Sequence, residues 1–256
     1  MKFPNFIIIG ATKCGTTALM VNLNKHPNIK TVSKTETSVE MHFWGYPIMN
    51  RYGFDWYKKK FDDDKVCGEK STDYWIKRKS MRLIKENIPN VKLILCVRNP
   101  ADRAFSNYQM HYRRGKVENF SYGLFLNDAN YFKKGLYYNN LKNNVLPFFD
   151  ADDIYICITE KMKADTSNEM AKLYRFLGVE NFELDVVDDS KNMTKEKIGN
   201  FASYLRKNEN RKCYVKWSMG TDSLTGKLRR EIVEYYKPYN KKFYEFLGYK
   251  IKEWDK

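Results

Sequence analysis

The sequence predicts an α/β fold in which a central parallel sheet is flanked by helices, built as one domain over residues 1–256. Four short apolar runs rich in β-branched residues have the composition of buried strands, and segments with helical spacing lie between them. Strands that alternate with helices and are apolar on both faces are typical of a parallel sheet covered on both sides. The chain is 43% hydrophobic, which is enough for one sizeable core.

The elements follow one another along the chain in a regular order. The expected strands are Phe6 to Ile9, Val66 to Gly68, Val91 to Val97 and Ile154 to Ile158. The expected helices are Thr16 to Leu23, Ala101 to Tyr112, Ser167 to Leu177 and Lys227 to Leu247, with Gly178 as the carboxyl cap of the third. Beyond about Asp188 the pattern weakens until the last helix. No repeat, low-complexity segment or Pro/Gly/Ser-rich linker indicates a second domain.

The charge balance favours an anionic partner. Lys and Arg number 46 against 31 Asp and Glu, a formal charge of +15. Such a potential suits a nucleotide, an acidic glycan, a nucleic acid or a membrane surface. Much of the excess lies in Lys-rich helix faces, for example residues 57–60 and 237–242, where solvation is the ordinary role. Charge alone therefore selects no function.

The cysteines and the amino end predict a compartment. No stretch approaches the roughly 20 apolar residues of a membrane helix, and residues 1–10 lack the pattern of a signal peptide. The five cysteines are scattered and contain no Cys-x-x-Cys pair, so we expect reduced core thiols. These features predict a cytoplasmic protein without a membrane span.

A Gly-rich loop follows the first expected strand and opens a helix. It reads Gly10-Ala11-Thr12-Lys13-Cys14-Gly15-Thr16-Thr17. Backbone N–H groups and a helix N-terminus converge on an anion in this context, which predicts a phosphate cradle and a P-loop-like form of the fold. The spacing is similar to a Walker A motif, but Thr16 replaces its Lys and Lys13 lies inside the loop instead. An ordinary turn with an exposed Lys is the alternative.

A second candidate anchor follows the third expected strand. Arg98 comes directly after this strand, and Ser106 lies about two turns into the following helix. An Arg fork and a Ser hydroxyl suit one phosphate group. Two separate phosphate anchors indicate a nucleotide with phosphate at both ends.

Taken in order, these motifs resemble the sulfotransferases that use 3′-phosphoadenosine 5′-phosphosulfate (PAPS). The Lys-x-Gly-Thr-Thr loop and the Arg-Asn-Pro-x-x-Arg-Ala-x-Ser-x-Tyr stretch carry the resemblance. In that family the first motif holds the 5′-phosphosulfate and the second holds the 3′-phosphate. The resemblance therefore implies nucleotide binding by Lys13, Cys14, Gly15, Thr16, Thr17, Arg98 and Ser106.

Within this family the chain is most similar to the heparan sulfate N- and 3-O-sulfotransferase domains. Three stretches carry this likeness: Glu40-Met41-His42-Phe43-Trp44, Gly53-Phe54-Asp55-Trp56-Tyr57 and Glu69-Lys70-Ser71-Thr72-Asp73-Tyr74. The likeness runs from about Pro4 to Gly178 and returns in Tyr235 to Trp254. Secreted relatives carry a disulfide-bounded loop near the carboxyl end, where this chain has only Cys213.

The resemblance also implies catalytic roles. Glu40 matches the base that takes the acceptor's proton, and His42 matches the residue that assists this base. On a strand-like segment the two side chains would point to the same side. Lys13 would place its charge on the bridging oxygen, and Lys70, after the second expected strand, matches a Lys that lines the site. The alternatives are an exposed acid at Glu40, a packing role for His42 and an ordinary turn Lys at position 70.

One tyrosine and two histidines are assigned no catalytic role. Tyr137 matches a recurrent family Tyr, but in a chain with 19 Tyr we expect it to be structural. His26 and His111 belong to no ligand pattern, and we expect no metal site.

Two other functions remain open from the sequence. A P-loop kinase would share the loop and the fold, although the Gly-Lys pair and an Asp for Mg²⁺ are missing. A basic nucleic-acid-binding protein would suit the charge, although no helix-turn-helix, zinc or RNP-like pattern accompanies it. For the sulfotransferase, the expected acceptor is a carbohydrate or a small-molecule natural product with a hydroxyl or an amine. The sequence leaves the acceptor's identity and the oligomeric state open.

Overall fold

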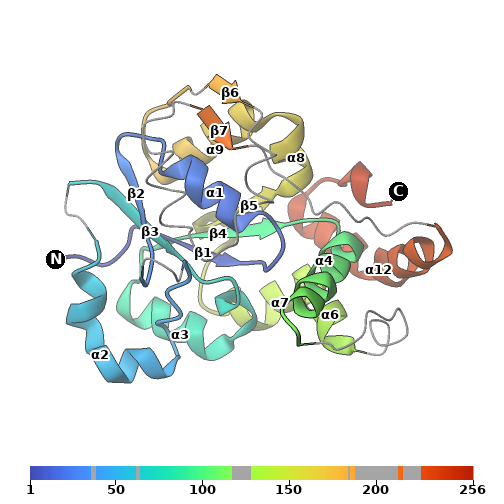
Figure 1. Cartoon of the computed structure of the whole chain (residues 1–256), viewed down its shortest axis with the longest axis horizontal. Coiled ribbons are helices and arrows are strands. Elements are labelled where there is room, and N and C mark those ends of the chain that lie inside the picture. Colours follow the sequence, from blue (N-terminus) through green and yellow to red (C-terminus); the bar gives the residue numbers. More distant parts are fainter. Residues whose placement is uncertain are drawn as a thin grey trace.

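The computed structural model describes residues 1–35, 39–61, 64–116, 128–183, 185–187, 213–215 and 226–255. At its centre lies a five-stranded parallel sheet in the order β2-β3-β1-β4-β5 (Figure 1). In chain order the strands are β1 (Phe6–Gly10), β2 (Ile29–Val32), β3 (Val66–Lys70), β4 (Lys92–Val97) and β5 (Ile154–Ile158). The predicted α/β class with a parallel sheet flanked by helices is confirmed.

The four expected strands are all present, and β2 is the strand of this sheet that the sequence pattern missed. The side chains of β1 and nearly all of β4 are buried, because helices cover both faces of the sheet. By contrast β2 is a short edge strand of four residues in which Lys30 is exposed. Its run of apolar residues is too short to stand out by periodicity.

Helices cover the sheet on two sides. The helices are α1 (Thr16–Leu23), α2 (Pro47–Lys58), α3 (Arg78–Asn87), α4 (Pro100–Arg113), α6 (Ala129–Lys133), α7 (Tyr137–Asn140), α8 (Thr159–Ala164), α9 (Thr166–Leu177) and α12 (Gly226–Leu247). Helices α1, α8 and α9 lie on one side, and α3 and α7 lie on the other (Figure 1). All four expected helices are found, and Gly178 caps α9 with a left-handed backbone.

The carboxyl ends of the central strands lie at one edge of the sheet. Ile8 on β1 is opposite Lys70 on β3 and opposite Ile94 on β4. The loops after β1, β3 and β4 therefore leave the sheet as neighbours. Strands β2 and β3 lie on one side of β1, and strands β4 and β5 lie on its other side. In parallel sheets with this change of direction, ligands bind at the edge formed by the carboxyl ends of the strands.

The last helix closes the fold near the same edge. The side chain of Asn99, just after β4, donates to the backbone oxygen of Trp254 at 3.2 Å. The rings of Phe243 on α12 and Trp254 stack at 5.8 Å, and both pack on Tyr137. The carboxyl end of the chain is thus part of the core behind the loop that follows β4.

Several sequence expectations concern segments outside this description. Residues 188–212 and 216–225, which contain most of the weakly patterned region, lie outside the described residues. Cys213 begins the short strand β7 (Cys213–Val215), which pairs with β6 (Asp185–Val187). The other four cysteines are buried thiols. No helix in the described ranges is long and apolar enough to cross a membrane. One domain over residues 1–256 stays a prediction.

Candidate active site

The loop between β1 and α1 has the backbone of an anion cradle. Lys13 and Gly15 both have positive φ, at 72° and 76°, and Gly15 directly precedes the first turn of α1. Gly tolerates this conformation, whereas for Lys13 it is uncommon and marks a special site. Gly10 is needed for another reason, because a Cβ there would lie 2.2 Å from Cδ1 of Trp75. The loop and the helix N-terminus thus present N–H groups at the edge of the sheet.

Two buried hydroxyls tie this loop to the end of β4. The Thr159 hydroxyl contacts the backbone oxygens of Cys14 at 3.0 Å and Val97 at 2.8 Å. The Tyr137 hydroxyl donates to the Arg98 oxygen at 2.7 Å, accepts from the Arg98 N–H at 3.2 Å and lies 3.6 Å from Sγ of Cys14. Tyr137 is therefore structural, as expected. It holds the two predicted phosphate anchors together.

Arg98 and Ser106 are both buried where the second anchor was predicted. Arg98 follows β4 directly and is 8% exposed, as is Ser106 on α4. The Nε of Arg98 has no hydrogen-bond partner in the described part of the chain. Burial lowers the pKa of its guanidinium, although nearby carboxylates oppose this. A buried cation with an unmet donor is a ready site for an anion.

The segment that carries Glu40 and His42 is held on the end of β3. The N–H of Met41 donates to the Lys70 oxygen at 3.1 Å, and the N–H groups of Phe43 and Trp44 donate to the Tyr74 hydroxyl at 2.6 and 3.1 Å. This segment is irregular and not a strand, so the expectation of alternating side chains was wrong.

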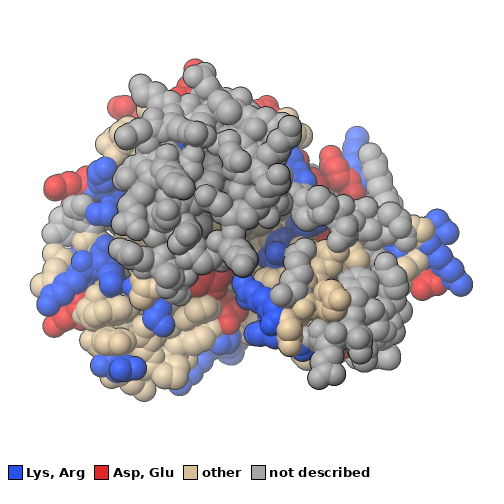
Figure 2. Space-filling view, in the orientation of Figure 1, with Lys and Arg blue, Asp and Glu red and all other residues tan. Residues whose placement is uncertain are grey.

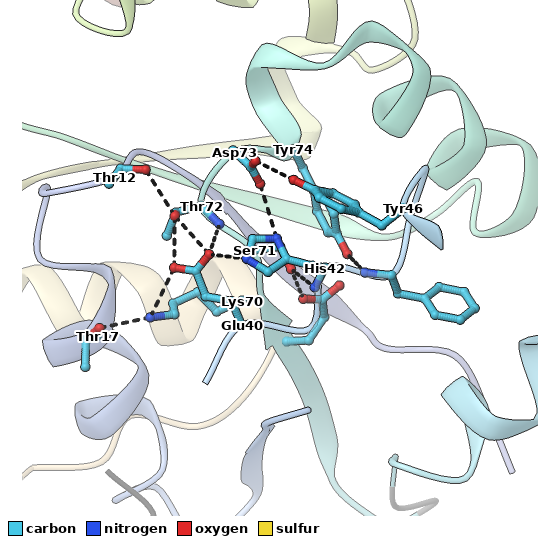
Figure 3. Close-up of polar contacts among 12 residues, drawn as sticks. Thr12, Thr17, Glu40, His42, Tyr46, Lys70, Ser71, Thr72, Asp73 and Tyr74 are labelled. Carbon is cyan, nitrogen blue, oxygen red and sulfur yellow. Dashed lines mark hydrogen bonds and ion pairs between the residues drawn. The ribbon is translucent and has the colours of Figure 1, made fainter. Parts of the chain in front are cut away.

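Glu40 and His42 nevertheless meet. His42 has a positive φ of 45°, and its N–H donates to the Ser71 hydroxyl at 2.9 Å. This turn brings Nε2 of His42 to 3.0 Å from Oε2 of Glu40 (Figure 3). The hydrogen bonds to β3, and not a strand's period of two, place the two side chains side by side.

Two polar paths connect Glu40 to the phosphate loop (Figure 3). In the first, the Thr72 hydroxyl contacts the Glu40 carboxylate at 2.9 and 3.1 Å and accepts from the Thr12 hydroxyl at 3.1 Å. In the second, Nζ of Lys70 lies 3.9 Å from Oε1 of Glu40 and donates to the Thr17 hydroxyl at 2.9 Å. The candidate base and the phosphate loop therefore form one network.

The charges in this network shift one another's pKa values. Burial raises the pKa of Glu40, but the hydrogen bond from His42 and the charge of Lys70 outweigh it and hold that pKa below the ordinary value. Interactions with the carboxylates of Asp73 and Glu40 raise the pKa of His42 to about 9, against the effect of burial. Burial lowers the pKa of Lys70. At neutral pH Glu40 is thus a carboxylate beside an imidazolium.

A buried acid lies beneath this network. Glu69 on β3 is fully buried and accepts from the Tyr57 hydroxyl at 3.0 Å and the Ser71 hydroxyl at 2.9 Å. Burial raises its pKa to about 7, although these hydrogen bonds oppose the rise. The Ser71 hydroxyl also accepts from the N–H of His42, so Glu69 helps, through Ser71, to hold the irregular segment that carries His42.

Other polar residues have roles away from this network. Nε2 of His26 contacts the Glu180 backbone oxygen at 2.9 Å, and Nδ1 of His111 contacts the Tyr131 hydroxyl at 2.8 Å. Cys14 is fully buried, and burial raises the pKa of its thiol to about 11. Its side chain belongs to the core, so any contact with a nucleotide would come from its backbone. Among the described residues no group of three His, Cys, Asp or Glu could hold a metal ion.

Sequence reasoning gave no role to Thr12, Thr72 or Asp73. Thr12 and Thr72 complete the path from the loop to Glu40, and Asp73 lies 3.4 Å from Nδ1 of His42. All three stand in motifs noted above, next to residues with assigned roles. Their position next to these residues could have marked them in the sequence. Their contacts, however, join residues that are some 30 to 60 positions apart, so only the fold shows which residues meet.

Basic side chains gather on one part of the surface. Lys and Arg gather between the part built by α2 and α3 and the part built by α4 and α6, with acidic side chains beside them (Figure 2). This local gathering is what an anionic substrate requires.

Comparison with known proteins identifies the family. The chain matches the family described as "Sulfotransferase domain" over residues 3–246. It is 26% identical over 264 residues to human heparan sulfate glucosamine 3-O-sulfotransferase 6, covering 96% of this chain and 72% of the relative. It is 27% identical over 270 residues to human heparan sulfate glucosamine 3-O-sulfotransferase 3B1, covering 99% of this chain and 65% of the relative.

Solved structures agree on the fold. A sulfotransferase from Alicyclobacillus acidocaldarius superposes with a TM-score of 0.70 at 21% identity, covering 100% of both chains. The sulfotransferase domain of an olefin synthase from Synechococcus PCC 7002 gives 0.55 at 15% identity, covering 98% of this chain and 97% of that one. At these identities the likeness concerns the fold alone. With its family match over residues 3–246, the chain belongs to the sulfotransferase family and is an enzyme that transfers sulfate.

Proposed function

We propose that this enzyme transfers a sulfuryl group from PAPS to a hydroxyl or an amine of a carbohydrate or small-molecule acceptor. The observation that carries the proposal is the double connection of Glu40 to the phosphate loop, through Thr72 and through Lys70. A candidate base next to a phosphate cradle is the arrangement that in-line transfer from a nucleotide requires.

The residues present fit a nucleotide with phosphate at both ends. Lys13, Gly15, Thr16 and Thr17 would hold the 5′-phosphosulfate, because they form the loop and the first turn of α1. Arg98 and Ser106 would hold the 3′-phosphate. The unmet donor of Arg98 supports this assignment, because a phosphate oxygen would satisfy it.

PAPS, when bound, would supply the sulfuryl group. The sulfur of this group bonds to the acceptor atom while the bond between sulfur and the bridging oxygen of the 5′-phosphate breaks. Glu40 accepts the proton that the acceptor loses, and the nucleotide leaves with the electron pair of the broken bond. Lys13 provides positive charge for the leaving oxygen. Lys70 links the base to Thr17 and keeps both in place.

His42 assists Glu40 and does not replace it. With a pKa of about 9, its ring is protonated at neutral pH and has no lone pair with which to accept a proton. Its Nε2 proton instead fixes one oxygen of the Glu40 carboxylate.

Isothermal titration tests the nucleotide. We expect adenosine 3′,5′-bisphosphate to bind without Mg²⁺ and ATP with Mg²⁺ to bind far more weakly. The reverse order would favour the P-loop kinase, which the family match already disfavours. Strong salt-dependent binding of unrelated DNA would instead revive a nucleic-acid-binding role.

A transfer assay tests the acceptor. The probe is ³⁵S-labelled PAPS with a panel of desulfated glycosaminoglycans, simple sugars, phenols and natural-product extracts. Two relatives are named for a glucosamine 3-hydroxyl of heparan sulfate, so unsulfated and N-sulfated heparosan belong in the panel. Label transferred to no acceptor would contradict the proposal. The cytoplasmic location stays a prediction, which the comparisons do not bear out.

A further inference from the structure

His42 is held between two carboxylates that come from different parts of the chain. Its Nε2 lies 3.0 Å from Oε2 of Glu40, and its Nδ1 lies 3.4 Å from Oδ1 of Asp73 (Figure 3). Asp73 follows β3, whereas His42 belongs to the irregular segment that packs on the end of that strand. The ring thus bridges the candidate base and a second acid.

Asp73 is itself fixed by two neighbours. Its Oδ2 accepts from the Tyr46 hydroxyl and lies 3.3 Å from Nζ of Lys77. Lys77 also lies over the Tyr46 ring, at 3.8 Å from its centre. Because both neighbours contact Oδ2, Oδ1 is left to face His42.

The ring of His42 needs such a partner. Its backbone is fixed by the hydrogen bond from its N–H to Ser71, and its ring packs 4.9 Å from that of Tyr46. The torsion that turns an imidazole about its bond to Cβ is broad and nearly two-fold. A contact at Nε2 alone leaves both the ring flip and the choice of tautomer open.

We propose that Asp73 is a positioning residue for catalysis, which holds the His42 ring so that both nitrogens keep their protons and Nε2 stays on Glu40. This inference rests on the proposed function, in which Glu40 is the base. Asp73 touches neither substrate nor nucleotide in this role. It acts through His42 on the orientation of the Glu40 carboxylate.

The charge of the ring agrees with this geometry. The interaction with Asp73 is the largest cause of the rise of the His42 pKa from 6.5 to about 9, followed by the interaction with Glu40. Burial alone would raise the pKa of Asp73, but its interactions with His42 and Tyr46 outweigh burial and hold that pKa below the ordinary value. Other charged or titratable groups face this cluster from neighbouring elements: Tyr46 before α2, Glu69 and Lys70 on β3, Lys77 before α3 and Lys134 after α6.

NMR of the imidazoles tests the contact without any acceptor. The chain has only three His, so the His42 signals are assigned by their loss in His42→Gln. In Asp73→Asn we expect the His42 pKa to fall from about 9 by roughly 1 to 3 units, as for the loss of a nearby opposite charge. His26 and His111 serve as internal controls. An unchanged His42 pKa in Asp73→Asn would overturn the inference.

Kinetics test the consequence, with the best acceptor of the panel. We expect Asp73→Asn to lower kcat by about tenfold or more. The alkaline limb of the pH profile should move to lower pH by the same amount as the His42 pKa. Binding of adenosine 3′,5′-bisphosphate should stay unchanged. Asp73→Glu should recover part of the rate, and Asp55→Asn, which removes an exposed Asp of α2, is the matched control.

The outcomes separate the inference from the proposed function. A slow Asp73→Asn enzyme with an unmoved pH profile would mean a merely structural role and overturn the inference. A normal Asp73→Asn enzyme beside an inactive Glu40→Gln would refute the inference alone. A fully active Glu40→Gln would refute the base and the inference with it, even where the NMR shift occurs. Asp73→Ser provides a second neutral variant if the Asn form does not fold.

Discussion

The base side of the site, Glu40, His42, Thr72 and Asp73, differs from its phosphate side, Arg98 and Ser106, in how polar groups find partners. On the base side each of these side chains lies within 3.4 Å of another, although Nδ1 of His42 and Oδ1 of Asp73 form an ion pair and no well-aligned hydrogen bond. On the phosphate side the buried Nε of Arg98 has no hydrogen-bond partner in the described residues. An unmet buried group costs about 1 to 3 kcal/mol.

This difference teaches which part of the site has its charges paired before substrate arrives. On the base side the protein itself supplies the opposite charges, so little rearrangement is needed at the moment of reaction. The phosphate side is completed by its ligand, so the cost of burying Arg98 is recovered on binding. Substitutions on the base side should therefore change rate or stability, and those on the phosphate side should change affinity.

The largest effect is expected from Glu40→Gln. The amide keeps the size of the side chain but cannot accept the acceptor's proton, so kcat should fall roughly 10²- to 10⁴-fold. The affinity for adenosine 3′,5′-bisphosphate, measured by titration, should barely change. Near-normal turnover of this variant would mean that another residue is the base, and would contradict the catalytic role of the base side.

The next effect concerns stability and comes from Glu69. Burial raises its pKa from 4.5 to about 7, so the folded state keeps a proton that the unfolded state has lost. Its contribution is fully present below pH 4.5 and is lost as the pH rises through about 7. Between pH 4.5 and about 7, the free energy of unfolding of wild type should fall by about 3 kcal/mol relative to that of Glu69→Gln, at roughly 1.4 kcal/mol for each pH unit.

Denaturant unfolding of both proteins at several pH values measures this difference. Glu86→Gln, which removes an exposed carboxylate of α3, is the matched control and should follow wild type. A difference between wild type and Glu69→Gln that stays constant from pH 4.5 to 8 would show that Glu69 ionises normally in the fold.

The sequence predicted most of the fold, and the site residues that it named stay predictions. Buried β-branched runs revealed β1, β3, β4 and β5, because strands covered on both faces are continuously apolar. The edge strand β2 left no such trace. The proximity of Glu40 and His42 was predicted for the wrong reason, since a left-handed turn at His42 brings them together. Asp73 escaped notice because its pairing with His42 depends on how an irregular segment packs on β3.

A smaller effect is expected on the phosphate side from Arg98→Ala. Loss of the charged fork should weaken the binding of adenosine 3′,5′-bisphosphate by about 1.5 to 3 kcal/mol, or about 10- to 150-fold in Kd. Because the variant also removes an unmet buried donor, the melting temperature without ligand should not fall. Arg82→Ala, an exposed Arg of α3, is the control. A variant that melts lower but binds normally would make Arg98 structural and reverse the comparison.

The smallest effect is expected from removal of divalent metals. In P-loop kinases a Lys after the second Gly and the next hydroxyl bind the phosphates and Mg²⁺, whereas here Thr16 takes the place of that Lys. Lys13, Lys70 and Arg98 supply positive charge at this edge of the sheet, so turnover in EDTA should equal turnover in Mg²⁺. Ionic strength must be matched, because a formal charge of +15 makes the binding of an anionic nucleotide sensitive to salt. Activity lost in EDTA and restored by Mg²⁺ would mean that the phosphate side is completed by a metal as well as by the nucleotide.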